Sequence, residues 1–185
     1  SRTVETFGAQ VGYRYENGDM GFMADVGYLS NIADVDYLAA ALKTAGSFDE
    51  RVDGWSLVLN GHYQGFDAEF QYTGALDNFA VADLEEVTGD ADGSEPEAWY
   101  LGVGYSFPTM GHDSRIGINY QESNDAAFGG TTGGAASFDG LPEERWQVDY
   151  TVNLWRNTDL AFQYVDDEDY SVADGGTGED SSTFL

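Results

Sequence analysis

The stretch from Phe7 to Tyr28 reads FGAQVGYRYENGDMGFMADVGY and decides the fold, because large apolar residues alternate with polar or small ones on both sides of a short turn. Alternation over this length predicts two β-strands, each with one apolar and one polar face. The turn, Asn17-Gly18-Asp19, is typical of the connection between two antiparallel strands. The stretch therefore predicts a long β-hairpin.

The same alternation recurs in six further segments. They lie around residues 55–64, 66–73, 98–107, 115–121, 145–154 and 159–164. At about 9–12 residues, most of these strands are longer than the usual 5–6 of a soluble sheet and close to the length that a tilted strand needs to cross a bilayer. The sequence therefore predicts an all-β protein with eight long strands.

The connections between these strands fall into two classes. Four are short, at residues 17–19, 64–65, 108–113 and 156–158, and four are long, at residues 30–53, 77–97, 122–144 and 166–182. The two classes alternate along the chain, and aromatic residues collect at the strand ends, as in an outer-membrane barrel with periplasmic turns and extracellular loops. The predicted fold is a transmembrane, antiparallel, up-and-down β-barrel of the porin type in the bacterial outer membrane.

Residues 1–185 are predicted to form part of a single barrel domain. The first strand would run inward from the outer surface, and residues 182–185 would begin a ninth strand. Because bacterial barrels have an even strand number, we expect the chain to be a fragment with about eight complete strands of a larger barrel. The soluble alternative is an acidic β-sandwich or a lipocalin-like barrel, whose strands would be shorter and whose loop lengths would not separate by end.

Composition narrows the classes of partner. The 34 acidic and 7 basic residues give a formal net charge of −27, which argues against nucleic acid, and 42% hydrophobic residues argue against a disordered acidic tail. The chain contains no cysteine, which excludes disulfides and thiolate sites. No apolar run approaches the roughly 18 residues of a transmembrane helix.

Most of the acid lies in the long connections, which hold 25 of the 34 acidic residues. An acidic rim would concentrate cations at the mouth of a pore, or it would keep the surface soluble and bridge lipopolysaccharide through divalent ions. The residues predicted to attract cations are Asp83, Glu85, Glu86, Asp90, Asp92, Asp167, Asp169, Asp174 and Asp180.

Two loop segments resemble calcium motifs, although no cofactor is predicted. Asp90–Glu95 begins like an EF-hand, but Leu101 stands at the twelfth position, where Glu is needed, so an EF-hand is excluded. Gly175–Asp180 matches one calcium-binding β-roll repeat; a single copy predicts a tight glycine turn, with weak calcium binding as the alternative. Asp36–Lys43 predicts a short helix in the first long connection.

The polar face of the predicted strands carries charges of both signs. We interpret them either as the lining of a pore or as cross-strand ion pairs that rigidify a narrow or plugged barrel. These residues are Arg14, Glu16, Asp25, His62, Asp67, Glu69, Arg115, Arg145, Asp149 and Asp159.

Catalysis has little support in the sequence. His62 lies near Asp67 and Glu69, a combination suited to acid–base chemistry, but it is two residues from a short turn, and His112 lies inside another. Neither histidine lies beside a serine on a strand-to-helix elbow. We expect the protein not to be an enzyme.

Four segments carry a resemblance to a known family. Phe7–Tyr13, Gly27–Asp34, Leu141–Glu143 and, most specifically, Asp167–Asp180 look like the C-terminal half of the LbtU-type siderophore porin family. The resemblance spans nearly the whole chain. It implies an outer-membrane barrel of about sixteen strands whose upstream half is absent here.

We therefore expect a porin that passes small hydrophilic solutes passively with a bias towards cations. Ferric siderophore is the cargo that the resemblance implies, and the surroundings would be outer-membrane lipid and lipopolysaccharide. The alternative is a closed structural or adhesion barrel whose acidic extracellular loops bind calcium, lipopolysaccharide or a protein.

Overall fold

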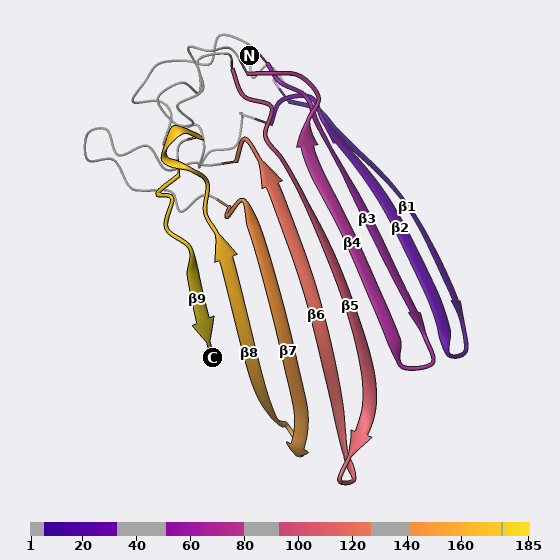
Figure 1. The fold of residues 1–185 in the computed structure, drawn as a ribbon. Helices are drawn as coiled ribbons and strands as arrows, with labels where there is room; N and C mark the ends of the chain where they lie inside the picture. Colours follow the sequence, from indigo (N-terminus) through magenta and orange to yellow (C-terminus); the bar gives the residue numbers. More distant parts are fainter. Residues whose placement is uncertain (1–5, 33–50, 80–92, 127–140, 175) are drawn as a thin grey trace.

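The described chain forms one antiparallel sheet. The computed structural model describes residues 6–32, 51–79, 93–126, 141–174 and 176–185. Nine strands pair in sequence order, each with the next, and Figure 1 shows them side by side from β1 in indigo to β9 in yellow. The sheet is open, with β1 and β9 at its edges. The all-β meander is thus confirmed, whereas closure into a barrel stays a prediction.

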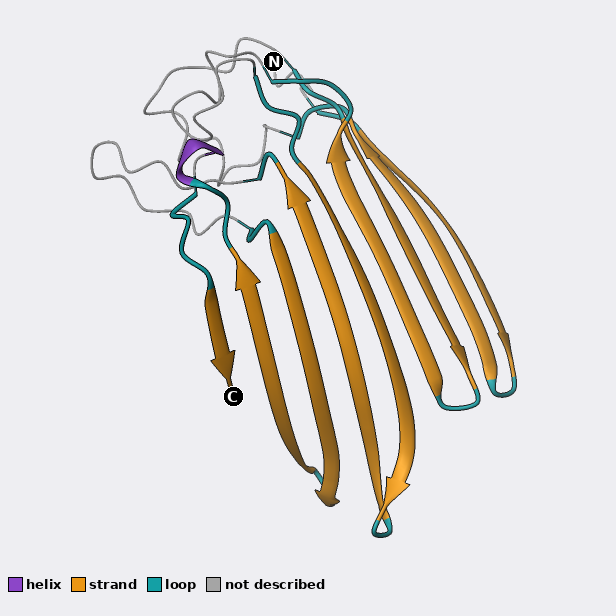
Figure 2. Cartoon of the chain, in the orientation of Figure 1, coloured by secondary structure: helices purple, strands orange, loops and turns teal. Residues whose placement is uncertain are grey.

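Eight long strands precede one short strand. They are β1 (Gly8–Asn17), β2 (Met20–Leu29), β3 (Gly54–Tyr63), β4 (Phe66–Ala75), β5 (Glu97–Thr109), β6 (His112–Asn124), β7 (Glu144–Trp155), β8 (Thr158–Glu168) and β9 (Ser181–Phe184). A single 3₁₀ turn, η1 (Val172–Asp174), stands before β9 in the described chain (Figure 2). Across the described residues, no helix is both long and apolar enough to cross a membrane.

Tight turns set the hairpin registers. In the β3–β4 turn, Gln64 and Gly65 both have positive φ, at 49° and 88°, and in the β5–β6 turn Met110 and Gly111 have φ of 51° and 85°. Two successive positive values are typical of a type I′ turn, whose twist matches that of the flanking strands. The β5–β6 hairpin therefore closes with two residues, so that His112, predicted to lie inside the turn, is the first residue of β6.

Short turns and long connections lie at opposite ends of the sheet, as predicted (Figure 2). We refer to these as the turn end and the loop end. The predicted helix at residues 36–43 lies outside the described residues. At the loop end, the buried apolar residues include Val52, Ala75, Phe79, Ala126 and Tyr170. Apart from Val152 on β7, the small apolar core of the described chain is therefore concentrated where the connections meet.

Each strand presents one apolar and one polar face. The cross-strand register places apolar residues opposite apolar residues. Leu101, for example, lies opposite Phe70 on β4 and Tyr120 on β6. Along this apolar face large side chains stay exposed, including Val103 at 43% and Trp146 at 49%. No other described element covers them, and the face is continuous from β1 to β9. A sheet face of this kind must be covered by lipid or by protein, since soluble monomers rarely expose apolar patches of such extent.

Candidate functional site

The polar face is the candidate site, because it carries all ten residues predicted to line a pore. The register confirms their common face. Asp67, for example, lies between His62 on β3 and Gly104 on β5, and Gly104 pairs onward with Gly117, which pairs with Asp149. The ten residues nevertheless fall into separate groups along the face.

Five of them gather on β1 to β4 near the turn end. They surround a groove of about 310 Å³ and are Arg14, Glu16, His62, Asp67 and Glu69. His62 Nε2 lies 3.6 Å from Glu16 Oε2, and Arg14 Nη2 contacts Met23 Sδ at 3.4 Å. The groove therefore combines both signs of charge.

Arg115 joins β4 to β7. Its guanidinium donates to both carboxylate oxygens of Asp67, at 3.0 and 2.6 Å, and to Asp149 Oδ2 at 3.1 Å. Arg115 also lines a second groove, of about 350 Å³, which contains Asn153 and Asp159. Asn153 donates from its Nδ2 to Asp159 Oδ1 at 2.9 Å. Cross-strand ion pairs, the alternative interpretation of these charges, are therefore present on the polar face.

The last two predicted residues, Asp25 and Arg145, line neither of these grooves. Gln10 Nε2 donates to Asp25 Oδ1 at 2.6 Å, on β1 and β2. Arg145 donates to the two oxygens of Asp167, at 2.6 and 2.8 Å. The prediction that Asp167 lies in a long connection is wrong, because β8 continues to Glu168 and places Asp167 opposite Arg145. The β7–β8 pairing therefore continues past the alternating apolar residues of β8, as far as Glu168.

A polar bridge that was not predicted from the sequence lies in the middle of the sheet. Tyr100 OH donates to Asn119 Oδ1 at 2.8 Å, and Asn119 Nδ2 donates to Asp149 Oδ1 at 3.2 Å. The alternation could have found Tyr100, since it stands between the apolar-face residues Trp99 and Leu101. The bridge links the polar face of β5 to β6 and β7.

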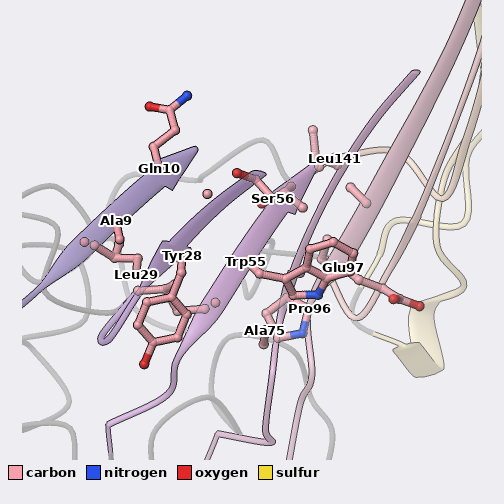
Figure 3. A pocket seen from close by; sticks show the side chains of 18 residues that line it. Ala9, Gln10, Tyr28, Leu29, Trp55, Ser56, Ala75, Pro96, Glu97 and Leu141 are labelled. Atoms are coloured by element: carbon pink, nitrogen blue, oxygen red, sulfur yellow. The ribbon is translucent and has the colours of Figure 1, made fainter. Parts of the chain in front are cut away.

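A larger cavity, of about 800 Å³, lies at the loop end of the polar face. Its floor is made of small residues such as Gly27, Ser56 and Ala98, and residues outside the strands, including Leu141, add apolar walls. Figure 3 shows Gln10 and Ser56 on the same side of the strands as Leu141, whereas Tyr28 projects from the other side. The volume lies in the range of small-molecule pockets. The sequence does not predict this cavity, because Leu141 is distant in sequence from these strands.

Tyrosine–carboxylate pairs mark the loop end of the apolar face. Tyr28 donates to Asp53, Tyr72 donates to Glu97 Oε2 at 2.7 Å, and Tyr120 donates to Glu122 Oε2 at 3.1 Å. A run of ring contacts crosses the strands at the same end, with Trp99 5.1 Å and Trp146 4.6 Å from Tyr120 between centroids. This row of aromatic rings with polar tips suits an interface between an apolar medium and water.

Asp169 organises the connection between β8 and β9. Its carboxylate accepts hydrogen bonds from the Thr177 amide at 2.7 Å, from the Thr177 hydroxyl and from the Tyr170 amide. Burial raises the pKa of Asp169, but these hydrogen bonds outweigh it and hold the pKa below its ordinary value. Gly178 has φ +68°, in the left-handed region that favours glycine; of the predicted glycine turn at residues 175–180, residue 175 lies outside the described residues.

The acidic residues predicted to attract cations are only partly described. Asp83, Glu85, Glu86, Asp90 and Asp92 lie outside the described residues. In the described chain, Asp174 accepts a hydrogen bond from Ser171 Oγ at 2.7 Å, and Asp180 is exposed just before β9. The described residues include no group of three or more His, Cys, Asp or Glu side chains placed to hold a metal ion.

Tyr170 links the connection after β8 to the connection after β6. Its hydroxyl lies 2.7 Å from Ser123 Oγ, at the end of β6, and accepts from the Ala126 amide at 3.4 Å. Burial raises the pKa of this phenol. Burial, together with the nearby Glu168 and Asp174, also raises the pKa of Glu143. Further along the loop end, the Glu95 amide donates to Asp125 Oδ2 at 3.1 Å. This hydrogen bond joins the connection before β5 to the connection after β6.

Comparison with known proteins identifies homologues without a named activity. The chain is 29% identical over 170 residues to a "UPF0422 protein" of Coxiella burnetii, which covers 90% of this chain and 34% of that protein. Two UPF0422 proteins of Legionella pneumophila, from strains Lens and Philadelphia 1, are 23% and 24% identical over 182 residues, which cover 91% of this chain and 31% of each. The chain thus spans about a third of the length of the curated relatives it matches. No family model and no solved structure matches. The resemblance to siderophore porins stays a prediction.

Proposed function

We propose that this chain is part of an outer-membrane β-barrel that passes small hydrophilic solutes passively, with a bias towards cations. The observation that carries the proposal is the division of one long-stranded sheet into an exposed apolar face and a charged polar face. A lipid-facing exterior and a wet interior require this division. The residues that would line the pore are those of the polar-face grooves described above.

Strand length supports a membrane location. At about 3.4 Å per residue, the 13 residues of β5 extend about 41 Å, and with the tilt of about 45° found in barrels they rise about 30 Å. The 10 residues of β1 rise about 22 Å by the same reasoning, close to the apolar band of about 25 Å. The tyrosine–carboxylate pairs would lie at the outer interface.

The orientation follows from the connections. Two-residue turns would face the periplasm and the long connections would face the outside, as in known barrels. The acidic excess of the whole chain, 34 residues against 7 basic ones, supports attraction of cations to the mouth. The loop-end cavity would then be the outer vestibule, where a solute enters before it meets the charged grooves.

The cargo rests on the resemblance. LbtU-type proteins imply ferric siderophore, and the cavity of about 800 Å³ is large enough for a small organic ligand. Passive passage is proposed because the polar face offers open grooves of mixed charge.

A closed structural or adhesion barrel is the second candidate. Arg115 and Arg145 each hold carboxylates across strands, which favours a rigid, filled interior. The connections joined through Tyr170 and Asp125 would then form a stable outer surface for calcium, lipopolysaccharide or a protein partner.

Conductance separates the two candidates. The full-length protein is inserted into a planar lipid bilayer under a salt gradient, and single-channel currents and the reversal potential are recorded. We expect stable ohmic steps and a reversal potential of the sign that cation preference requires; block by a ferric siderophore would identify the cargo. Silence from a folded, heat-modifiable protein would contradict the porin. Loss of surface attachment on deletion of residues 77–97, from a folded protein that conducts neither before nor after the deletion, would support the adhesion barrel.

A further inference from the structure

Arg115 is held across four strands in a fixed position. It starts on β6, reaches over β5 to Asp67 on β4, and also contacts Asp149 on β7. The bidentate pairing with Asp67 fixes the plane of the guanidinium. The polar bridge from Tyr100 through Asn119 to Asp149 fixes the second carboxylate as well.

Glycines create the space in which this side chain lies flat on the sheet. A Cβ at Gly104 would come within 2.2 Å of Arg115 Nη2, and a Cβ at Gly117 would come within 2.7 Å of Arg115 Nη1. Both distances are far below van der Waals contact. Any larger residue at these two positions would lift the guanidinium from the strands, so the glycine pair sets its height above the sheet.

The three charges of this cluster remain in contact with solvent. The side chains of Arg115, Asp67 and Asp149 are 37%, 41% and 19% exposed. Ion pairs with this exposure contribute little to stability. Their charges still act on mobile ions that pass within about a Debye length, which is roughly 8 Å at physiological salt.

Among the polar-face arginines in the described chain, Arg115 occupies a distinct place. Arg145 pairs with Asp167 near the loop end, and Arg14 lies on the edge strand against Met23. Arg115 lines one groove and binds Asp67, which lines the other. Its charge therefore bears on both grooves at once.

We propose that Arg115 is a selectivity-determining residue of the pore, and this rests on the function proposed above. With Arg115 in place the cluster has a net charge of −1; without it, Asp67 and Asp149 leave a charge of −2 on the same surface. The fixed guanidinium limits the preference for cations at this level of the pore. The substrate class it governs is small charged solutes, which it admits or slows by sign.

The test measures the cation-to-anion permeability ratio of the full-length protein in planar bilayers, from the reversal potential under a KCl gradient. Arg115→Gln is expected to raise the ratio about threefold, the order of effect of one unit charge several ångströms from the ion path. Arg115→Lys keeps the charge and is expected to stay close to the parent. Arg156→Gln is the matched control, because it removes the same charge from the exposed β7–β8 turn, outside the lining of the two grooves, and should change the ratio much less than Arg115→Gln does.

A second variant keeps the test decisive if Arg115→Gln does not fold. Asp67→Asn with Asp149→Asn leaves Arg115 unpaired, and the ratio is expected to fall below that of the parent. An unchanged ratio in conducting Arg115→Gln channels, or in the double variant, would overturn the role of Arg115 and leave the porin intact. Equal shifts in Arg115→Gln and Arg156→Gln would also overturn it. A parent protein that never conducts would overturn the proposed function, and the role of Arg115 with it.

Discussion

Replacement of Val103 by arginine tests whether the apolar face contacts lipid. Val103 is the central residue of β5, and it is 43% exposed on a face that no other described element covers. On the lipid side of a barrel strand, an arginine at the bilayer midplane lowers the free energy of unfolding by about 2–4 kcal/mol. At a site exposed to water, the same change would alter it by about 0.5 kcal/mol or less.

Depth and face provide the controls. Phe107 lies four residues nearer the turn end on the same face, about 14 Å along β5, and thus roughly 10 Å from the midplane if the strand is tilted by about 45°. Each arginine variant is compared with alanine at its own position, which removes the difference in packing. Phe107→Arg is expected to cost about 0–1 kcal/mol relative to Phe107→Ala. Gln147→Arg, on the polar face beside Val148, is expected to cost close to nothing.

The assay is reversible guanidinium unfolding of the full-length protein in lipid vesicles, followed by tryptophan fluorescence. The expected order of destabilisation is Val103→Arg, then Phe107→Arg, then Gln147→Arg. A Val103→Arg variant within about 0.5 kcal/mol of Val103→Ala would refute the reasoning, since it would place this residue in water. Equal costs on the two faces would refute it as well.

Three further predictions concern the ends of the sheet. Tyr170→Phe removes the hydroxyl that contacts Ser123 Oγ at 2.7 Å, so hydrogen exchange at residues 123–126 should show local protection reduced by about 1–2 kcal/mol, with the strands unaffected. Because the pKa of Asp169 is lowered from its ordinary 3.8, its stabilisation of the β8–β9 connection should be complete above about pH 4 and lost as the pH falls through the lowered value; exchange at the Thr177 amide, corrected for intrinsic rate, measures this, and no pH dependence in Asp169→Asn is the matching control. Met110→Gly should stabilise the protein to chemical unfolding by up to about 1 kcal/mol, because Met110 is 97% exposed with φ +51°, and destabilisation would show that its side chain makes a contact absent from the described chain.

The strands could be predicted because alternation is a local property. Residues such as Val11, Leu57 and Ile118 mark one face without reference to any partner, and the turn residues Gly18 and Gly65 mark where the chain reverses. Adjacent strands joined by two-residue turns then have little freedom of register. The order of the sheet and the assignment of the ten charged residues to one face follow from the same pattern.

What could not be predicted depends on contacts between distant segments. Asp167 belongs to β8 because Arg145 lies opposite it, whereas alternation alone ends at Tyr164. Tyr170 is buried because it meets Ser123, 47 residues earlier. Small residues at Gly104 and Gly117 could be assigned to the polar face, but their use as the floor beneath Arg115 depends on a side chain from a different position.

The sequence also could not predict how the charged residues of the polar face are grouped. The sequence leaves a pore lining and cross-strand ion pairs as open alternatives; on the polar face of the structure Arg115 is paired, whereas Arg14 and Glu69 border an open groove. An arginine can bind carboxylates and still line a water-filled space, because its exposed edge is not consumed by the pairing. The two interpretations are therefore not exclusive for individual residues.

The most direct test of the account is a labelling scan of residues 146–151 in β7. The 185-residue chain contains no cysteine, so a single cysteine introduced here gives one thiol within it for a nitroxide spin label. In vesicles, labels at positions 146, 148 and 150 should be accessible to oxygen dissolved in lipid, and labels at 147, 149 and 151 should be accessible to a water-soluble nickel chelate. Equal accessibility to the nickel chelate at both sets of positions would contradict a sheet that separates lipid from an aqueous pore.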